Sequence, residues 1–479
     1  MEHIFNTSGL RLAQDLREGI YSASELVEEY IQKIEAVNPR LNAVVHDRFQ
    51  LARQEAKQAD QKLMQTKQKD ELPPYLGVPC TVKESFQLSG MPNSAGLLSR
   101  EQVIAKEDAV VVGRLRAAGA IPLGVTNTSE LCMWMESNNK VYGRTNNPYD
   151  QDCIAGGSSG GEGAIIGSGA SVFGIGSDVG GSIRMPAFFC GVFGHKPSSR
   201  LIPNHGQHPP AKRKARDYLC TGPLCRHAED LEPLVRIFAG PSSRDGHCEE
   251  TVLSSVDEVS IKDLEVVTVP DNGRITVSDD LKTRQEDAVR ALQKAGARIR
   301  TQRLRGFQDS LEIWSTLMSE AAEVPYVDHL RNGRNFNLAR EATRLFLGRS
   351  EFTVPSLGLV LVEKISAKMT KRSQQMQRAF RQLQSEISQV LKPNTVLLFP
   401  SYACPAPKHT QPLYLPIRWQ YTAIINVLEL PATQVPLGLN SGGKPLGIQV
   451  IAHHGADHLT LAVACFLENT FGGWQPPDL

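Results

Sequence analysis

A glycine- and serine-rich stretch in the middle of the chain holds the residues best suited to chemistry. Between Gly156 and Gly194 lie 13 of the chain's 39 glycines, together with the serine-bearing runs GGSSGGEGA and GSDVGGSIRMPA. Glycine lets backbone N–H groups approach a ligand closely, so a loop of this kind typically holds an anion or an oxyanion. Apolar residues interleaved with the glycines, such as Ile165, Phe173 and Ile183, exclude a flexible linker, because linkers do not carry that much apolar surface.

Two other interpretations fit this stretch less well. The segment from Gly174 to Gly176 is followed by Val179 where a dinucleotide-binding fingerprint needs its third glycine, and no Walker lysine–serine pair is present. The segment from Gly157 to Gly161 fits the G-x-S-x-G elbow of α/β-hydrolases, with Ser159 as nucleophile, but the elbow needs a strand immediately upstream and residues 146–152 are loop-like. Its histidine would come from the C-terminal side: His453, His454 or His458.

The two serine-bearing runs resemble the signature of the amidase signature family. The 24 positions that separate Ser158 from Ser182 are similar to the family's spacing, and an earlier run, Val82-Lys83-Glu84, matches the end of a family strand. Further matches in GAIPLGVTNTSE, GPLCRHAEDL and LELPATQVPLGLNSGGKPLGIQV extend the resemblance over nearly the whole chain. The resemblance implies the amidase signature fold, an α/β architecture with a large mixed central β-sheet that helices cover on both faces (α/β/α).

The resemblance also implies a Ser-Ser-Lys catalytic triad formed by Lys83, Ser158 and Ser182. Ser182 would be the nucleophile, and Ser158 would carry a proton between Ser182 and Lys83. The oxyanion hole would consist of four backbone N–H groups, those of Val179, Gly180, Gly181 and Ser182. Such a site would hydrolyse amides through a covalent acyl-serine intermediate.

Amide hydrolysis by this device needs an uncharged lysine. An amide is a poor electrophile with a poor leaving group, so the nucleophile must be activated and the departing nitrogen must receive a proton. A free lysine has a pKa of about 10.4 and is charged at neutral pH, whereas burial can lower that pKa by several units. The apolar neighbours Val78, Pro79 and Val82 on the expected strand predict such burial for Lys83.

Three neighbouring residues, Ser159, Asp178 and Arg184, are candidates for supporting roles. Ser159 belongs to the same serine pair as Ser158 and is a secondary candidate for the proton network. Asp178 and Arg184 flank the nucleophile loop, and we expect them to brace it through a charge-assisted contact rather than to react. His195 lies in a Gly-His-Lys-Pro turn, so we expect a structural role there as well.

Composition excludes several classes of protein. Hydrophobic residues make up 41% and charged residues 22% of the 479 positions, and no window reaches the roughly 18 apolar residues of a membrane span. A net charge of +1 gives no field for nucleic acid, so we expect no nucleic-acid partner. Nine cysteines without a signal peptide indicate reduced thiols in the cytosol or facing it. Cys220, Cys225 and His227 have no second pair of ligands, so we predict neither metal nor cofactor.

The elements around these residues suggest two regions. Residues 1–60 are expected to form helices that pack on the core, one of them starting with a capping box at Ser22 and ending before Asn38-Pro39. Residues 61–479 are expected to form the catalytic domain, because strand–helix–strand units recur at 76–124 and 264–299. Within it, residues 307–375 are helical and predict a cap over the substrate channel.

An apolar island within the predicted cap has two interpretations. Phe352 to Val362 is the longest apolar run of that region and reads either as a buried helix or as an exposed apolar rim that meets a lipid surface or a greasy substrate. The resemblance is strongest to family members that hydrolyse primary fatty amides and N-acylethanolamines, so we expect a hydrophobic amide substrate. Another substrate for the same machinery, in a small-molecule amidase or an amidotransferase subunit, is the alternative.

The same resemblance leaves partners and location open. Those family members carry an N-terminal hydrophobic anchor ahead of the catalytic domain, whereas this chain begins about where that domain should begin. We therefore expect a cytoplasmic protein or one associated with a membrane on its cytosolic side. Peripheral contact with a membrane or lipid droplet, and a homodimer, stay open as further partners.

Overall fold

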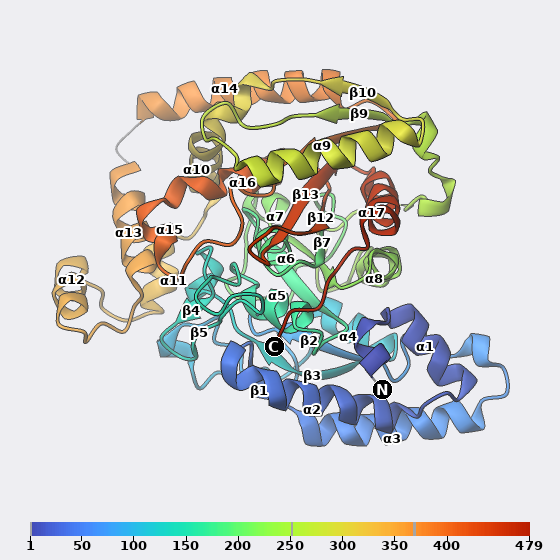
Figure 1. Ribbon diagram of the computed structural model, residues 1–479. Helices are drawn as coiled ribbons and strands as arrows, with labels where there is room; N and C mark the ends of the chain where they lie inside the picture. The colour runs from blue at the N-terminus through green and yellow to red at the C-terminus, as the bar shows by residue number, and fades with distance from the viewer. Residues whose placement is uncertain (1, 251, 367–369) are drawn as a thin grey trace.

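The centre of the molecule is a mixed β-sheet of eleven strands in the order β1-β3-β2-β6-β8-β7-β12-β13-β11-β9-β10. The computed structural model describes residues 2–250, 252–366 and 370–479 (Figure 1). Strands β3, β2 and β6 run parallel to one another, as do β11, β9 and β10, and the other neighbours are antiparallel. The strands are β1 (Val44–Asp47), β2 (Pro79–Lys83), β3 (Ile121–Thr126), β6 (Phe173–Asp178), β7 (Phe193–Lys196), β8 (Cys220–Cys225), β9 (Glu265–Thr268), β10 (Arg298–Thr301), β11 (Thr395–Phe399), β12 (Ala432–Leu439) and β13 (Pro445–Ala452). Strands β4 (Asn138–Asn139) and β5 (Gly143–Arg144) form a separate pair.

Helices cover both faces of this sheet, as the resemblance implied. Successive side chains of a strand point to opposite faces, and on β11 Val396 and Leu398 belong to one apolar core while Leu397 and Phe399 belong to another. The first core takes side chains from α1 (Gly9–Glu18), α2 (Ala23–Leu41), α3 (Phe49–Gln65), α4 (Val110–Ala117), α5 (Gly160–Gly167), α8 (Leu231–Phe238), α9 (Asp279–Lys294) and α17 (Asp457–Phe471). The second takes them mainly from α6 (Arg184–Phe189), α7 (Ala215–Tyr218), α10 (Ser310–Ala321), α14 (Thr370–Val390) and α16 (Gln420–Val427).

The N-terminal helices pack directly on the sheet. Ser22 and Glu25 form the predicted capping box at the start of α2. The predicted helix end was wrong, because α2 continues through Pro39 to Leu41 and ends only where Asn42 adopts a left-handed conformation with φ of 50°. Helix α3 runs across residue 60, so the boundary between residues 1–60 and 61–479 falls inside a helix, and this division stays a prediction.

Between β10 and β11 in the sequence, a group of short helices forms the region that was predicted as a cap. It contains α10, α11 (Tyr326–Arg331), α12 (Leu338–Phe346) and α13 (Val354–Ser366), and α14 returns the chain to the sheet. Figure 1 shows α11, α12 and α13 together at one side of the molecule. Positions 367–369 of the predicted cap lie outside the described residues.

Most of the apolar island lies in the first part of α13, which has one buried and one exposed face, and contact of the exposed face with lipid or substrate stays a prediction. Leu357 and Val360 are buried in a small core of their own with Leu97 and Leu131 from the main body. Val354, Leu361 and Val362 are exposed on the other face. Within the described ranges, every helix is too short or too polar to cross a membrane.

Candidate active site

Lys83 is the last residue of β2 and is completely buried. Its Nζ donates hydrogen bonds to Ser158 Oγ at 2.7 Å and to Ser177 Oγ at 2.9 Å. In the described part of the chain, no carboxylate forms an ion pair with this amine. Burial lowers the pKa of Lys83 from its ordinary value of 10.5, although Cys132, Asp178 and Glu162 lie close enough to oppose the shift.

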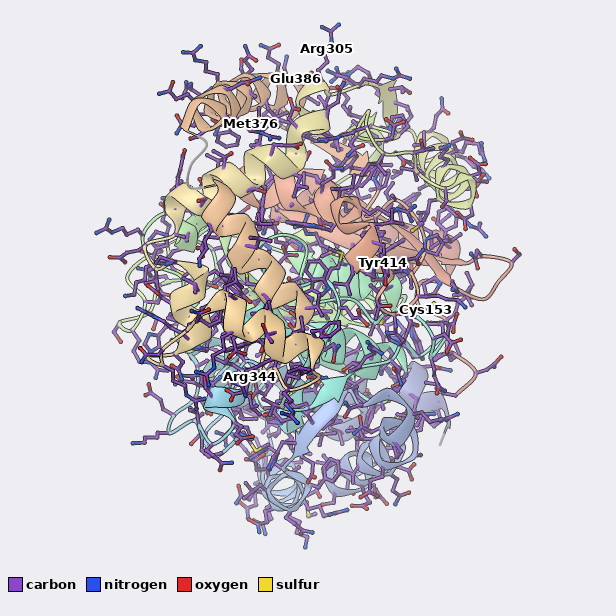
Figure 2. All side chains as sticks on the ribbon, turned by 90° about the vertical axis from the view of Figure 1, so that its left-hand side faces the viewer. Cys153, Arg305, Arg344, Met376, Glu386 and Tyr414 are labelled. Atoms are coloured by element: carbon purple, nitrogen blue, oxygen red, sulfur yellow. The ribbon has the colours of Figure 1, made fainter. Side chains whose placement is uncertain are left out.

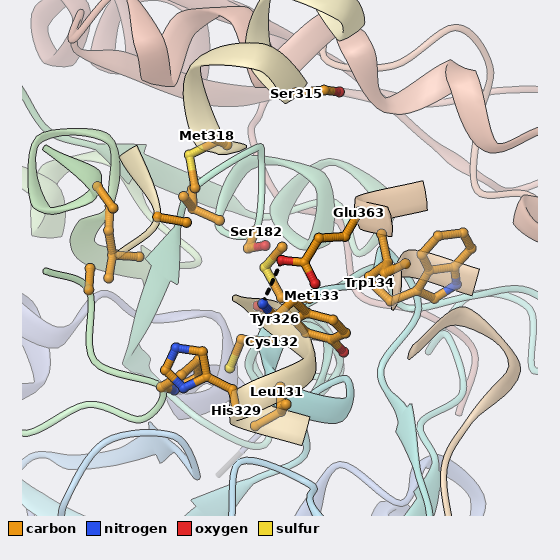
Figure 3. A pocket seen from close by; sticks show the side chains of 18 of the residues that line it. Leu131, Cys132, Met133, Trp134, Ser182, Ser315, Met318, Tyr326, His329 and Glu363 are labelled. Carbon is orange, nitrogen blue, oxygen red and sulfur yellow. Dashed lines mark hydrogen bonds between the residues drawn. The ribbon is translucent and has the colours of Figure 1, made fainter. Parts of the chain in front are cut away.

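Ser158 and Ser182 approach the lysine from two different loops. Ser158 lies two residues before α5, and Ser182 lies two residues before α6. The loops are joined through the backbone, since the N–H of Ser159 donates to the carbonyl of Ser182 at 3.2 Å. Across the described residues, no hydrogen bond joins the Ser158 and Ser182 hydroxyls directly, but both residues line the same cavity. Figure 3 labels Ser182 in this cavity. The structure therefore brings Lys83 and Ser158 into contact and leaves Ser182 beside them.

The loop before Ser182 offers backbone donors. The amide of Gly181 donates to Asp178 Oδ1 at 2.7 Å, so one of the four predicted oxyanion donors is already engaged. The amides of Val179, Gly180 and Ser182 make no hydrogen bond to any described residue. Gly181 has φ of 121°, and a Cβ at this position would collide with the Thr422 hydroxyl, which explains why the loop needs glycine there.

Asp178 and Arg184 form a fully buried ion pair under this loop. Arg184 donates to the Asp178 carboxylate from Nε at 3.1 Å and from its terminal nitrogen at 3.0 Å. Burial alone would raise the pKa of Asp178, but the Arg184 guanidinium and the backbone donors hold it far below its usual range. The pair also reaches Gln449 and Asn426, which ties the loop to β13 and α16. The expected charge-assisted contact between Asp178 and Arg184 is present, and its bracing role stays a prediction.

The remaining predicted residues lie apart from the lysine. Ser159 Oγ contacts the backbone of Ser177 at 3.4 Å and has no contact with the amine. His195 is buried between Thr433 and Asp457, with ring nitrogens 2.8 and 3.0 Å from their oxygens. No strand leads into Ser159, because residues 155–159 form a loop, so the α/β-hydrolase elbow is wrong.

Sequence reasoning missed Ser177, the second hydroxyl that contacts Lys83. Ser177 belongs to β6, which pairs in parallel with β2, so its side chain comes from the neighbouring strand. A neutral amine has two N–H donors and one lone pair, and two hydroxyl neighbours can satisfy it without any ion. The only sequence signal for Ser177 is its position inside the run GSDVGGS.

A cavity of about 660 Å³ opens beside these hydroxyls. Its wall at this end contains Ser158, Ser177, Val179 and Ser182. Most of the remaining wall is apolar and comes mainly from η4 (Glu130–Cys132), α10, α13, η9 (Pro416–Trp419) and the segment 207–219. It includes Leu131, Met133, Leu311, Trp314, Met318, Leu359, Val362, Ile417 and Trp419. In Figure 3, Met318 and Trp134 lie on different sides of Ser182, with Tyr326 and Glu363 from the cap between them. The region predicted as a cap thus forms part of the cavity wall.

Comparison with known proteins identifies the family. A family model described as Amidase matches residues 25–461. The chain belongs to the amidase signature family. It is 45% identical to fatty-acid amide hydrolase 2 of Homo sapiens over 99% of this chain and 91% of the relative, and 44% identical to fatty-acid amide hydrolase 2-B of Danio rerio over the same shares. A solved structure titled fatty acid amide hydrolase shares the fold with a TM-score of 0.75 at 21% identity, covering 98% of this chain and 86% of that one.

These findings confirm that the chain is an amidase of this fold, closely related to fatty-acid amide hydrolase 2. The geometry around Lys83 and the apolar cavity supply the arguments for the roles of the reacting residues.

The buried ion pair gives a prediction about stability. Arg184→Met keeps much of the side-chain volume but leaves the Asp178 charge buried without its cation, so the free energy of unfolding should fall by about 3–5 kcal/mol. Denaturant titration followed by circular dichroism measures the change. Arg300→Met, which removes a half-exposed cation from β10, is the matched control and should change stability by less than about 1 kcal/mol. Equal effects of the two substitutions would contradict the bracing role.

Proposed function

We propose that the protein hydrolyses fatty-acid amides, both primary fatty amides and N-acylethanolamines, to the fatty acid and the amine. The observation that carries this proposal is the long apolar wall beside Ser182, because a hydrocarbon chain gains free energy by leaving water for such a surface. A volume of about 660 Å³ is ample for a long acyl chain. Similarity to fatty-acid amide hydrolase 2 supports the same substrate class.

Attack begins with proton transfer along the hydroxyls. Uncharged Lys83 accepts the proton of Ser158 Oγ, and Ser158 Oγ accepts the proton of Ser182 Oγ as that oxygen forms a bond to the amide carbon. The contact of 2.7 Å between Lys83 and Ser158 supports the first transfer. The second transfer requires Ser182 to rotate toward Ser158, which substrate binding can induce, since catalytic hydrogen bonds often tighten only in the bound complex.

Collapse of the tetrahedral intermediate reverses the proton path. The C–N bond breaks, the departing nitrogen receives a proton from Ser158, and Ser158 recovers one from Lys83. Water then attacks the acyl-Ser182 ester by the same route and releases the fatty acid. The free amides of Val179, Gly180 and Ser182 stabilise the negative oxygen at each stage, and each such donor typically contributes about a hundredfold or more in rate.

A substrate panel tests the proposed substrate class. Oleamide and anandamide should be hydrolysed with kcat/KM at least about a hundredfold above that of an aryl acetamide, because each buried CH₂ contributes about 0.8 kcal/mol. Free glutamine should be inert. Ser182→Ala, assayed in parallel, should abolish turnover of every substrate. Turnover of glutamine or the aryl amide alone would favour the alternative amidase function and contradict the fatty-amide proposal.

The lysine gives a prediction about pH. Since only uncharged Lys83 can act as the base and burial lowers its pKa, kcat/KM should rise with pH along a limb below the ordinary lysine value of 10.5. Lys83→Ala should lower kcat/KM by about 10²–10⁴ and remove that limb. Lys196→Ala, at another buried lysine outside the cavity, is the control for general damage and should preserve the limb in the folded fraction. A limb that survives in Lys83→Ala would show that another group is the base.

We propose in addition that the cap meets a lipid surface. Phe346 is 91% and Leu361 is 50% exposed, and Leu361 belongs to an apolar groove between α12 and α13 that shares Val354 and Gly358 with the main cavity. Tyr414, next in sequence to the lining residue Leu413, is 80% exposed. Figure 2 shows this side, with Tyr414 and Arg344 of α12 labelled. A greasy substrate could then pass from the lipid into the cavity without crossing water.

Co-sedimentation with phosphatidylcholine vesicles tests the lipid contact. Phe346→Ser combined with Leu361→Ser should weaken binding at least about tenfold, since burying one such side chain contributes about 1.5–3 kcal/mol. Met64→Ser, which removes an equally exposed apolar side chain from α3, should leave binding unchanged. Failure of the wild-type protein to sediment with vesicles would overturn this contact.

A further inference from the structure

A buried glutamate behind the lysine has no role in the proposed proton path. Glu162 lies on α5 and is completely buried. Its two carboxyl oxygens form hydrogen bonds with Thr81 Oγ1 at 2.7 Å and with Thr126 Oγ1 at 2.8 Å, and Thr81 Oγ1 also lies 3.0 Å from Ser171 Oγ. The space is closed on the side of β6 as well, because a Cβ on Gly174 would collide with the Glu162 carboxyl. The fold therefore holds this one carboxyl in a fitted position.

The contacts of Glu162 join the segments that carry the reacting groups. Thr81 is two residues before Lys83 on β2, and Thr126 is the register partner of Lys83 on β3. Glu162 itself follows Ser158 by four residues, in the first turn of α5. One carboxyl thus connects both strands beside Lys83 to the helix that follows Ser158. The position of the Glu162 carboxyl therefore affects the 2.7 Å contact between Lys83 and Ser158.

The surroundings of Glu162 favour its uncharged form. No Lys, Arg or His forms an ion pair with it among the described residues. Two titratable groups face it, Lys83 and the Cys80 thiol, both from β2, while β3 contributes Thr126 and β6 contributes Gly174. The nearest charges on β6 and α6, Asp178 and Arg184, satisfy each other. Burial raises the pKa of Glu162 to about 8, although Thr81, Thr126 and Lys83 oppose the shift.

We propose that Glu162 is a positioning residue that works as an uncharged carboxylic acid, tying α5 to β2 and β3 so that Lys83 meets Ser158. A protonated carboxyl can donate one hydrogen bond and still accept another, which suits two threonine hydroxyls. An ionised carboxylate at the same place would stabilise the ammonium form of Lys83 and so remove the base. The inference rests on the proposed role of Lys83 in the proton path.

Glu162→Gln separates the charge of the residue from its shape. Glutamine keeps one donor group and one acceptor group in nearly the same volume, so kcat/KM should stay within about threefold of wild type, the scatter typical of a substitution that conserves its contacts. The acid limb of the pH profile should not move. If Glu162 were ionised, its removal would lower the Lys83 pKa and shift the limb to lower pH by at least about one unit.

Two further variants test the connection itself. Thr126→Val removes one of the two contacts without changing the shape, and kcat should fall about tenfold with little change in KM, because the Lys83–Ser158 geometry loosens. Thr395→Val, at another buried strand threonine on β11 remote from the site, is the matched control and should leave kcat unchanged. Equal kcat values for the two variants would overturn the positioning role.

Infrared difference spectroscopy observes the proton directly. Subtracting the spectrum of Glu162→Gln from that of wild type at pH 7 should show the C=O band of a protonated carboxyl. Carboxylate bands in its place, a shifted acid limb, or a folded but inactive Glu162→Gln would each overturn the inference. If Lys83 were not the base, the Lys83→Ala enzyme would keep the acid limb of the pH profile. The infrared result is independent of this outcome, because it reports only whether Glu162 carries a proton.

Discussion

The proposed mechanism depends on one energetically unfavourable arrangement. The Lys83 amine is buried away from water, with hydroxyl groups as its hydrogen-bond partners. A lysine in this setting keeps its proton less readily, since the charged form loses hydration and gains no ion pair in return. The sheet helps to hold the amine in this place, because Lys83 terminates an interior strand that β3 and β6 flank, and its side chain is completely buried. The proposed chemistry requires no other activated group.

Among the described residues, the carboxyl groups near the site form no ion pair with the Lys83 amine. Asp178 is occupied by Arg184 and by the backbone of the nucleophile loop, so its charge shapes that loop. Glu162, in the uncharged form that we propose, contributes no charge at all. Burial therefore accompanies opposite pKa shifts in the two carboxyls, raised for Glu162 and lowered for Asp178, because only Asp178 has a cation within hydrogen-bond reach.

Much of this could be read from the sequence, for reasons that differ between residues. The runs around Ser158 and Ser182 are long and specific, so they predicted the family, the mixed sheet and the loops that hold the candidate triad. The capping box at Ser22 follows from a local pattern and was predictable in the same way. The end of α2 was not, because Asn38-Pro39 is a good turn signal that tertiary packing overrode.

The residues that the sequence could not reveal act through neighbouring strands. Ser177 contacts Lys83, and Thr126 contacts Glu162, because β6 and β3 flank β2 in the sheet. Local sequence patterns do not predict the order of strands in a sheet. The engagement of the Gly181 amide by Asp178 depends likewise on the turn geometry of the loop. The island in the cap was ambiguous for a physical reason, since one face of α13 is buried and the other is exposed.

Labelling with a fluorophosphonate tests the proposed proton path from Ser182 to Lys83 most directly. We expect a single adduct, mapped by peptide mass spectrometry to Ser182, whose rate of formation rises with pH along the same limb as catalysis. Lys83→Ala should slow this labelling by about 10²–10⁴, because the proton of Ser182 then has no destination. An adduct on another serine such as Ser159, or labelling at an unchanged rate without Lys83, would contradict this path.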